Sequence, residues 1–258
     1  MRKTIRDIVD KMNRTPIVMV TAYDAWSAAI VDVSVDCILV GDSLGMVVQG
    51  RENTIPVTLD EMIYHTKMVM RGSKQACVVC DLPFLSYQTS VRDAILSAGR
   101  CLKEGCAQAV KLEGGKSIVP QIAGIVESGM PVVGHLGLTP QSINVFGKYG
   151  KQAKSDSEAQ RLLEEAKAIE EAGVSMIVLE SIPHALARQV TVDIGVPTIG
   201  IGAGADCDGQ VQVFHDLFGL SPGFTPRHAK QYTSSGTDMM RGIGEYAEQV
   251  RAKSFMSK

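Results

Sequence analysis

The sequence predicts an α/β fold in the form of a closed (β/α)8 barrel. The chain has 258 residues, and about 250 residues is typical of one such barrel. Short apolar runs, rich in β-branched residues and mostly ended by a polar or charged residue, recur along it, each long enough for a strand and too short for a helix. Helical patterns lie between these runs, and strands that alternate with helices indicate a parallel sheet. The runs are Ile17–Thr21, Cys37–Asp42, Cys77–Asp81, Ala109–Glu113, Val132–His135, Met176–Glu180 and Thr198–Ile201.

Helix signals separate these runs. The clearest helix is expected to begin at Ser155, because Ser155 and Glu158 have the spacing of a capping box, and to stop at Gly173. A second helix is expected over Val119–Ser128, with Pro120 tolerated in its first turn. The runs themselves are continuously apolar, which fits strands that are covered on both faces.

The count of eight units depends on a weaker strand expected near Val211–Leu217. Eight units favour a closed barrel over an open doubly wound sheet. No linker, low-complexity tract or sharp change of composition divides the chain, so residues 1–258 are expected to form a single barrel domain. The segment from about Gly236 to Lys258 is expected to form a terminal helix that packs against another subunit.

The charge balance excludes some classes of protein. Lysine and arginine number 26 against 28 aspartate and glutamate residues, a formal net charge of −2. A nucleic-acid-binding protein needs a clustered basic face, so this balance argues against one. No apolar run approaches the ~20 residues that cross a bilayer. Because the N-terminal segment also lacks the apolar centre of a secretory signal, we expect a cytoplasmic protein.

The cysteines are expected to be buried structural thiols. A disulfide framework is not expected in a chain of this length with cysteines inside apolar segments. Cys77 and Cys80 match a C-x-x-C motif, but residues three apart in a strand point to opposite faces and cannot share one metal ion. The six cysteines are Cys37, Cys77, Cys80, Cys101, Cys106 and Cys207.

Polar residues close several of the predicted strands. In a (β/α)8 barrel the active site lies at the carboxyl ends of the strands, so these residues are candidates for it. Lys111 and Glu113 are two apart in one strand, and therefore point to the same face. The candidates are Asp42, Asp81, Lys111, Glu113, His135 and Glu180.

Each candidate alone has a plainer explanation. An aspartate after a strand is often a turn former or a helix cap, and a lone histidine can be a satisfied core residue. Four carboxylates that converge on one mouth repel one another, however, and raise one another's pKa. A divalent cation or a protonated carboxyl would resolve the repulsion, and oxygen ligands without clustered Cys or His favour Mg²⁺ over Zn²⁺. The cluster as a whole therefore predicts a functional site.

Longer motifs cover most of the chain, in order, from about Thr21 to Leu220. They are TAYDAWSA, ILVGDSLGMVVQG, DLPFLSY, VKLEGG, PVVGHLGLTPQS, IVLESIP, PTIGIGAGADCDGQV and FHDLFGL. Together they closely resemble the ketopantoate hydroxymethyltransferase (3-methyl-2-oxobutanoate hydroxymethyltransferase) family. Any one of them alone would not be specific.

The resemblance implies a barrel of the phosphoenolpyruvate/pyruvate-related type, Mg²⁺ dependence and a ring-like homodecamer. It implies transfer of a hydroxymethyl group from 5,10-methylenetetrahydrofolate to 3-methyl-2-oxobutanoate, giving 2-dehydropantoate through an enolate that Mg²⁺ stabilises. This reaction belongs to pantothenate (vitamin B5) and coenzyme A synthesis. Carried over by motif, the metal ligands are Asp42, Asp81 and Glu113, the oxo-acid-binding residues are Asp42, Ser43, Asp81 and Lys111, the proton acceptor is Glu180, and His135 lines the same pocket.

The sequence departs from the family pattern at two places. Ser34 stands where such proteins usually have glycine, a helix-end change with little expected effect on chemistry. The stretch GKYGKQAK, Gly147–Lys154, differs from the family's usual loop near the site. This difference bears on loop closure or folate contact, and does not bear on the metal site.

Two alternatives stay open. A Mg²⁺-dependent C–C lyase of the isocitrate lyase or oxaloacetate decarboxylase type would share the barrel, the metal and the carboxylates. Such lyases commonly use a cysteine-bearing loop, whereas the fourth strand here continues into KLEGGKS. A non-catalytic barrel that binds an oxo acid as a sensor is disfavoured by the complete set of metal ligands, cation and base.

Overall fold

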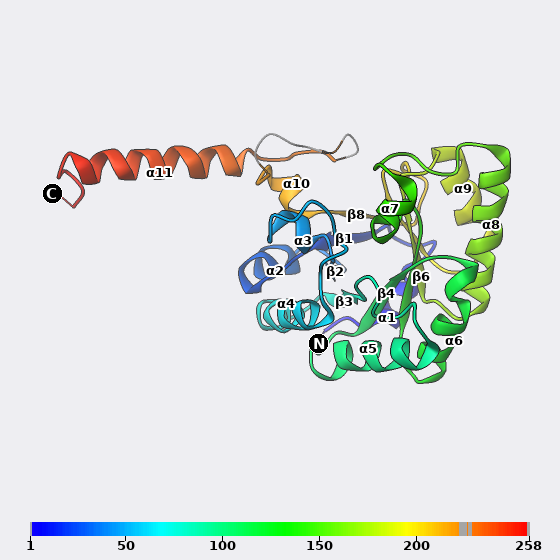
Figure 1. Ribbon diagram of the computed structural model, residues 1–258. Helices are drawn as coiled ribbons and strands as arrows, with labels where there is room; N and C mark the ends of the chain where they lie inside the picture. Colours follow the sequence, from blue (N-terminus) through cyan, green and yellow to red (C-terminus); the bar gives the residue numbers. More distant parts are fainter. Residues whose placement is uncertain (1, 222–225, 227–228, 257–258) are drawn as a thin grey trace. The chain divides into compact units, whose positions relative to one another are not determined.

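Within the residues that the structure describes (2–221, 226 and 229–256), eight parallel strands pair in chain order and close into a barrel (Figure 1). Beside β1, the backbone N–H of Ile17 donates to the carbonyl of Asp208 at 2.9 Å. The predicted (β/α)8 fold is therefore confirmed. The strands of this computed structural model are β1 (Ile17–Thr21), β2 (Cys37–Val40), β3 (Cys77–Asp81), β4 (Ala109–Glu113), β5 (Val132–Gly137), β6 (Met176–Glu180), β7 (Thr198–Ile201) and β8 (Gly209–Gln212).

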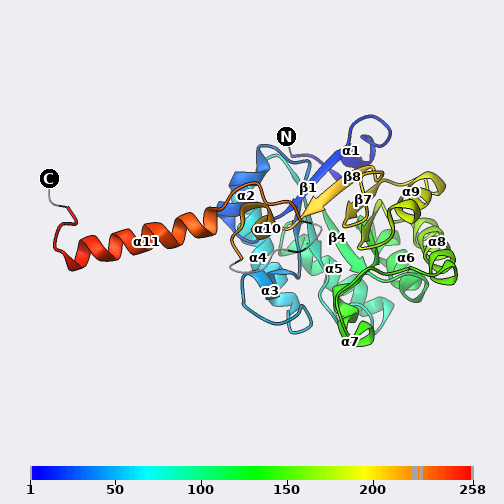
Figure 2. The same cartoon turned by 90° about the horizontal axis from the view of Figure 1, so that it is seen from above.

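Helices cover the outside of the strands, as two perpendicular views show (Figures 1 and 2). The longer ones are α2 (Ala25–Asp32), α4 (Leu59–Gly72), α5 (Val91–Lys103), α6 (Val119–Glu127), α8 (Asp156–Glu171) and α9 (His184–Asp193). Shorter elements precede β1 or follow individual strands. They are α1 (Ile5–Val9), α3 (Leu44–Val47), α7 (Ile143–Phe146) and the 3₁₀ turns η1 (Lys116–Ile118) and η2 (Pro140–Ser142).

The helix signals read from the sequence are present as hydrogen bonds. The backbone N–H of Ser155 donates to the Glu158 carboxylate at 3.0 Å, and the backbone N–H of Glu158 donates to Ser155 Oγ at 3.4 Å, so α8 begins with the predicted capping box. Gly173 follows α8 with a left-handed φ of +95°. Pro120 lies in the first turn of α6. Both predicted helices are therefore confirmed.

Side chains that point into the barrel alternate along each strand. The interior is closed at the amino-terminal end of the strands, here called the floor, by α1, whose Ile8 is fully buried among the inward-facing residues. The opposite end, at the carboxyl termini of the strands, is called the mouth. The inward-facing apolar residues are Ile17, Met19, Cys37, Leu39, Cys77, Val79, Ala109, Val133, Met176, Val178, Ile199, Ile201 and Val211.

Two carboxylates hold the floor together. Asp32 accepts hydrogen bonds from Ser73 Oγ at 2.6 Å and from the backbone N–H groups of Lys74 and Ala76 at 2.8 and 2.9 Å. The Arg2 guanidinium donates to the same Ser73 hydroxyl at 2.7 Å. Segments far apart in the sequence are thus joined through one buried carboxylate.

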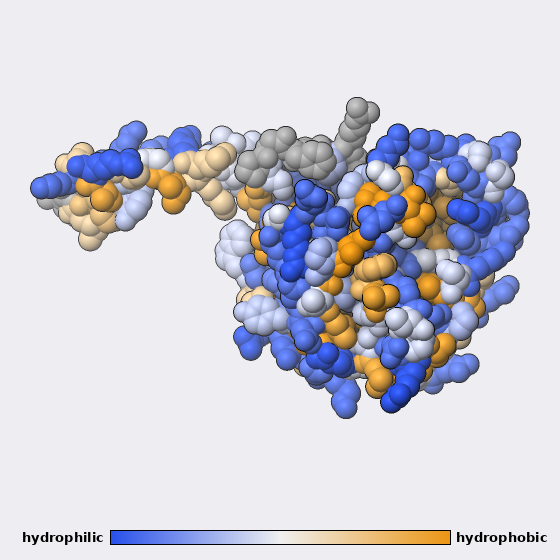
Figure 3. Space-filling view, viewed as in Figure 1, coloured by the Kyte–Doolittle hydropathy of each residue, from blue (hydrophilic) through white to orange (hydrophobic). Residues whose placement is uncertain are grey.

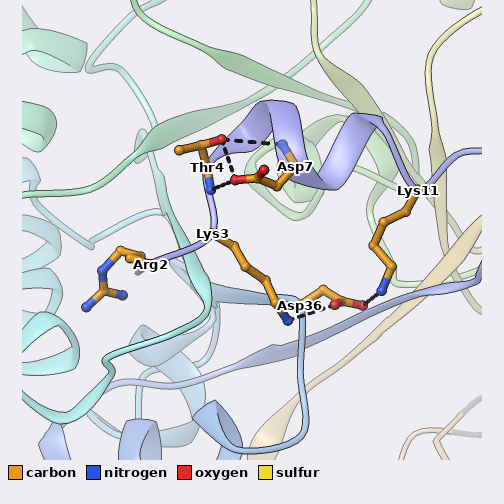
Figure 4. Close-up of a pocket in the computed structure, with 6 residues that line it drawn as sticks. All are labelled: Arg2, Lys3, Thr4, Asp7, Lys11 and Asp36. Atoms are coloured by element: carbon orange, nitrogen blue, oxygen red, sulfur yellow. Dashed lines mark hydrogen bonds and ion pairs between the residues drawn. The ribbon is translucent and has the colours of Figure 1, made fainter.

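Asp36 is the second floor carboxylate (Figure 4). It forms ion pairs with Lys3 at 2.9 Å and Lys11 at 2.7 Å, and accepts a hydrogen bond from the backbone N–H of Val18 at 3.1 Å. Burial alone would raise the pKa of Asp32 and Asp36, but their hydrogen bonds outweigh it and lower both values. Both carboxylates therefore stabilise the fold in their charged form.

The observed bounds of the eighth strand differ from those expected from the sequence. It lies at Gly209–Gln212, whereas the expected segment Val211–Leu217 continues into a helix at Phe214–Phe218. Polar residues interrupt the apolar pattern of β8, since Gln210 is exposed and Gln212 half-buried. Glycine is required at position 209 for a steric reason, because a Cβ there would collide with the carbonyl oxygen of Ile17.

The cysteine prediction is wrong in part. All six are free thiols and four are buried, but Cys106 is exposed and Cys207 is half-buried. Cys106 lies in the turn before β4 with a φ of +63°, which places it outside the packed layers. Cys77 belongs to the interior cluster, while Cys80 Sγ lies 3.5 Å from Cys101 Sγ of α5. The two therefore face opposite sides of the sheet, as predicted.

The chain divides into two compact units, Met1–Val211 and Gln212–Lys258. The second unit contains α10 (Phe214–Phe218), in which the rings of Phe214 and Phe218 are 4.7 Å apart, and α11 (Ser235–Arg251). The expected terminal helix is thus present and ends at Arg251, while the single-domain organisation stays a prediction. Among the described residues, no helix is long and apolar enough to cross a membrane.

Candidate active site

The inward-facing series changes from apolar to polar at the mouth. In β4, Ala109 belongs to the apolar interior, and Lys111 and Glu113 continue the same face toward the carboxyl end. The strands β3, β5 and β6 change in the same way. Side chains predicted separately from the sequence are therefore brought together in one mouth. These inward-facing polar residues are Asp81, Lys111, Glu113, His135 and Glu180.

Lys111 is the cation at the centre of this group. Only 4% of its surface is exposed. Its Nζ lies 3.3 Å from Asp81 Oδ1, 3.7 Å from Glu113 Oε1 and 3.2 Å from His135 Nδ1. Burial would lower the pKa of Lys111, but the surrounding carboxylates raise it on balance, so the ammonium stays charged.

His135 separates Lys111 from Glu180. Burial, together with the nearby Lys111 charge, lowers the pKa of His135 to about 4, so the imidazole is neutral at pH 7. Its Nδ1 lies 3.2 Å from the Lys111 ammonium, which can only donate, and also 3.2 Å from Glu113 Oε1. Nε2 lies 3.3 Å from Glu180 Oε2. The ring therefore lies between the Lys111 and Glu113 side chains on one side and the carboxylate expected to act as base on the other.

Asp42 and Ser43 come from the turn after β2. The backbone N–H of Asp42 donates to Asp81 Oδ2 at 3.1 Å, and Ser43 Oγ lies 2.9 Å from the Tyr23 hydroxyl. Gly41 permits this close turn, since a Cβ there would lie 2.8 Å from Ser43 Oγ and 3.5 Å from Asp81 Oδ2. Ser43 is thus near the mouth but bonded to Tyr23 instead of to the carboxylates.

Gln141 connects the candidate metal ligands, and the sequence analysis assigned it no function. Its Nε2 donates to Asp42 Oδ2 at 2.9 Å and to the carbonyl of Leu82 at 2.9 Å. Its backbone N–H donates to Glu113 Oε2 at 3.0 Å. The side chain is 4% exposed. One buried glutamine from the segment after β5 therefore orients carboxylates that follow β2 and lie in β4.

Tyr87 supports Gln141 and was also missed. Its hydroxyl donates to Gln141 Oε1 at 2.9 Å, and accepts a hydrogen bond from the backbone N–H of Glu113 at 3.1 Å. Both residues lie in segments that directly follow strands, which is the one sequence signal that could have marked them. Their contacts depend on loops meeting in space, which spacing along the chain does not reveal.

The mouth carboxylates are strained electrostatically. Burial, together with the charge of Glu113, raises the pKa of Asp42 to about 7. Burial also raises the pKa of Asp81 to about 7, although the Lys111 charge opposes the change. The pKa of Glu113 is likewise raised by burial. One ammonium thus faces several buried carboxylates, and the site favours additional positive charge or protons.

The donor chemistry of the mouth fits a hard divalent cation. Asp42, Asp81 and Glu113 supply only oxygen atoms, and Asp81 Oδ1 is buried without a hydrogen bond from the described residues. In the described part of the chain, however, no group of three or more His, Cys, Asp or Glu side chains is already arranged around a metal position. The ligand set Asp42, Asp81 and Glu113 therefore stays a prediction.

Comparison with known proteins identifies the family. The profile of ketopantoate hydroxymethyltransferase matches residues 2–258. The chain belongs to this family. A 3-methyl-2-oxobutanoate hydroxymethyltransferase from Clostridium botulinum (strain Alaska E43 / Type E3) is 51% identical over 257 residues, covering 99% of this chain and 94% of that protein. The corresponding protein of Moorella thermoacetica (strain ATCC 39073 / JCM 9320) is 54% identical over 240 residues, covering 93% and 89%.

The family membership confirms the sequence resemblance. A ketopantoate hydroxymethyltransferase is a transferase of pantothenate synthesis, so the prediction of a hydroxymethyltransferase is confirmed. The lyase alternative gains no support from the relatives, whose printed names describe the transferase.

Solved structures share the barrel. Phosphonopyruvate hydrolase has a TM-score of 0.65 and 10% identity, covering 100% of this chain and 90% of that chain. A 2,3-dimethylmalate lyase, described as a member of the PEP mutase/isocitrate lyase superfamily, has a TM-score of 0.62 and 15% identity, covering 97% and 89%. At these identities the likeness shows the fold alone, which is the barrel described above.

Proposed function

We propose that this member of the family transfers a hydroxymethyl group from 5,10-methylenetetrahydrofolate to 3-methyl-2-oxobutanoate, giving 2-dehydropantoate. One observation carries the proposal. The Lys111 ammonium and the Glu180 carboxylate contact opposite nitrogens of the His135 ring, at 3.2 and 3.3 Å. A cation and a base held one imidazole apart suit the removal of a proton beside a carbonyl group.

Lys111 is proposed to bind the oxo acid. Its ammonium is buried, charged and fixed by Asp81 and Glu113, so it attracts the oxygens of a 2-oxo acid without having to be ordered first. Asp42, Asp81 and Ser43 complete the oxo-acid pocket in this proposal. The neutral His135 ring lines the same pocket, between Lys111 and Glu180.

Glu180 is proposed to take the proton from C3. Its side chain is 16% exposed against 3% for Asp81 and Glu113, so it is the mouth carboxylate best placed to meet an incoming substrate. The C3–H electron pair becomes the enolate, whose oxygen faces the Lys111 charge. C3 then bonds to the folate methylene carbon as the bond from that carbon to one folate nitrogen breaks. Water adds its oxygen to the same carbon as the bond to the second nitrogen breaks, and both nitrogens take up protons, from Glu180 and from water, as tetrahydrofolate leaves.

The proposed cofactor is Mg²⁺, held by Asp42, Asp81 and Glu113. When bound, it would act as a Lewis acid at the oxo-acid oxygens and add to the positive charge of Lys111. The raised pKa values of Asp42 and Asp81 support this assignment, and so does the buried Asp81 Oδ1, which has an ion pair with Lys111 at 3.3 Å but no hydrogen bond from the described residues. Gln141 would keep Asp42 and Glu113 oriented toward one point.

Deuterium exchange tests the proposal. Wild-type protein is incubated with 3-methyl-2-oxobutanoate in D₂O, and loss of the C3 proton signal is followed by proton NMR with Mg²⁺ and then with EDTA. Exchange that requires Mg²⁺ and proceeds without folate is the expected result. Turnover with 5,10-methylenetetrahydrofolate then identifies the one-carbon donor. Exchange at the same rate in EDTA would remove Mg²⁺ from the proposal.

The terminal helix supports a homo-oligomer, which we also propose, with ten subunits as the family resemblance implies. Along α11 an apolar stripe at spacings of four, three and four residues is exposed at every position, and no residue of the helix is buried. Light scattering on the purified protein measures the subunit number. The stripe is Met239, Ile243, Tyr246 and Val250.

A cytoplasmic location completes the proposal. All six cysteines are free thiols, which fits a reducing compartment. Fractionation of cells that express the tagged chain measures the location.

A further inference from the structure

The segment Gly147–Lys154, between α7 and α8, lies beside the mouth and is not used by the proposed oxo-acid chemistry. The backbone N–H of Gln152 donates to the carbonyl of Ser181 at 2.8 Å, directly after Glu180. The Tyr149 hydroxyl lies 3.8 Å from Met46 Sδ, in the helix that follows Asp42. The segment is therefore attached to the ends of both β2 and β6.

Tyr149 presents an aromatic ring close to the reacting groups. Its side chain is only partly buried, with 44% of its surface exposed. Burial and the nearby carboxylates of Asp42, Glu180 and Glu113 raise the pKa of its phenol, so the ring stands within electrostatic range of the whole carboxylate group.

Apolar side chains are also exposed in the segments that follow β3 and β5. Val145 of α7 is 85% exposed, and Leu85, in the segment after β3, is 60% exposed. In the space-filling view an apolar patch lies over α7 with hydrophilic residues beside it (Figure 3). Exposed apolar residues at the rim of a polar site are typical of a surface that binds a ligand.

Three lysines accompany the ring. Lys148, Lys151 and Lys154 are all exposed, and none of the ion pairs in the described part of the chain involves them. No acidic residue occurs from Pro140 to Ser155. The Glu158 carboxylate lies close by, but it accepts hydrogen bonds from backbone N–H groups at the start of α8. The segment thus joins an aromatic ring to a row of unneutralised cations.

We propose that Gly147–Lys154 binds the folate co-substrate, with Tyr149 against its aromatic rings and the three lysines on the carboxylates of its glutamyl tail. The inference rests on the proposed function. It adds that the enzyme prefers, among folate co-substrates, those with several glutamates in the tail. A flat aromatic body attached to a chain of carboxylates matches the apolar rim and the adjacent cations in both chemistry and order.

The test compares mono- and triglutamyl 5,10-methylenetetrahydrofolate as substrates. The triglutamyl form has two more carboxylates than the monoglutamyl form. Two additional exposed ammonium–carboxylate contacts imply a preference of roughly 2- to 30-fold in KM for the triglutamyl form. Changing the three lysines together to glutamine should remove this preference. Raising the salt concentration should reduce it in the wild type, because exposed charges are screened.

A second triple variant controls for net charge. Lys67, Lys74 and Lys103 are also exposed and take part in no ion pair of the described chain, and they lie on or after α4 and at the end of α5. Changing these three to glutamine alters the net charge equally and should leave the triglutamyl preference intact. A wild type without the preference, or equal loss in both triple variants, overturns the proposal.

Tyr149 is tested separately. Tyr149→Ala should raise KM for the monoglutamyl substrate by roughly 5- to 100-fold, the range expected for one aromatic stacking contact, while Tyr149→Phe should retain the wild-type value. Tyr64→Ala, at a tyrosine of α4 that is 62% exposed, is the matched control. An unchanged KM in Tyr149→Ala removes the ring from the proposal.

Failure of this inference is distinguishable from failure of the proposed function. Mg²⁺-dependent C3 exchange without folate checks the oxo-acid site in every variant. If exchange occurs but no folate turns over, equilibrium binding of mono- and triglutamyl tetrahydrofolate is measured instead. Equal affinity for the two, or no affinity for either, overturns the tail site and leaves the exchange result standing.

Discussion

The floor and the mouth of the barrel both bury carboxylates, yet the pKa values of these carboxylates are shifted in opposite directions at the two ends. At the floor, Asp32 and Asp36 are surrounded by hydrogen-bond donors, and their pKa values are lowered. At the mouth, burial and neighbouring charges raise the pKa values of Asp42 and Asp81 to about 7. Floor carboxylates therefore stabilise the fold, whereas those at the mouth reduce its stability.

The difference follows from the number of donors. Asp32 accepts bonds from a hydroxyl and from successive backbone N–H groups, so its charge is neutralised by donors of the protein itself. Asp81 has one backbone donor and shares one ammonium with Glu113. Unsatisfied charge of this kind is typical of a site that binds a ligand, and proteins tolerate it where function requires it.

The largest expected effect comes from replacing the proposed base at the mouth, which should remove activity without lowering the stability of the fold. Glu180→Gln should reduce C3 exchange by about 10²–10⁴-fold, the usual contribution of a general base. Binding of the oxo acid, measured by calorimetry, should be retained. Glu165→Gln, at a half-buried glutamate of α8, is the control. Exchange at the wild-type rate in Glu180→Gln would show that another group is the base.

The next effect concerns the residue that orients the carboxylates. Gln141→Leu keeps the volume but removes the hydrogen bonds to Asp42 and Leu82. We expect Mg²⁺ affinity, measured by calorimetry, to fall about 10–100-fold, as for other residues that orient metal ligands. Gln160→Leu, at a glutamine of α8, is the matched control. Unchanged Mg²⁺ affinity in Gln141→Leu would assign Gln141 to packing alone.

A pair of matched substitutions tests the comparison directly. Asp32→Asn places an amide N–H group next to the hydroxyl and backbone N–H groups that donate to Asp32. It should lower the free energy of unfolding by about 2 kcal/mol. Asp42→Asn removes one of the crowded charges and should raise it by about 1 kcal/mol in EDTA. Urea unfolding at pH 7 measures both. Changes of the same sign would break the distinction between floor and mouth.

The pH dependence of stability tests the same comparison in a second way. For Asp32 and Asp36 the folded pKa lies below the unfolded value of 3.8, so their contribution is complete above about pH 4 and is lost as pH falls through the folded pKa. For Asp42 and Asp81 the folded pKa is about 7, so the metal-free protein loses stability as pH rises from about 4 to 7.

Variants separate these two pH ranges. Asp42→Asn should reduce the decline between pH 4 and 7 by up to about 1.4 kcal/mol per pH unit, the contribution of one proton. Asp36→Asn should reduce only the loss below pH 4. Urea unfolding in EDTA across this range measures both. A decline between pH 4 and 7 that survives Asp42→Asn unchanged would place its origin elsewhere.

Most of the fold was predictable because strands buried on both faces appear as continuous apolar runs. β4 and β6 were found with their observed bounds. β8 was misplaced because polar residues, including the exposed Gln210, interrupt its apolar pattern. The exposed Cys106 was missed because local composition does not show that a turn leaves the packed layers.

The site residues that lie within a strand could be predicted from the sequence, whereas those that lie in loops and meet only in the folded chain could not. Lys111 and Glu113 follow from alternation within β4, and Glu180 follows from its place at the end of β6. Gln141 and Tyr87 act through contacts across 26 to 99 residues of sequence. No local pattern encodes such a contact, so it required the folded chain.

The alternation of β4 has a consequence for how the chain can vary. Ala109, Lys111 and Glu113 point inward because they share a parity along the strand. A single residue inserted before Lys111 would reverse that parity and turn both charged groups into the helical layer, although the composition would hardly change. Substitutions can therefore be explored one at a time in this strand, whereas insertions and deletions are acceptable only in pairs or in the connecting loops.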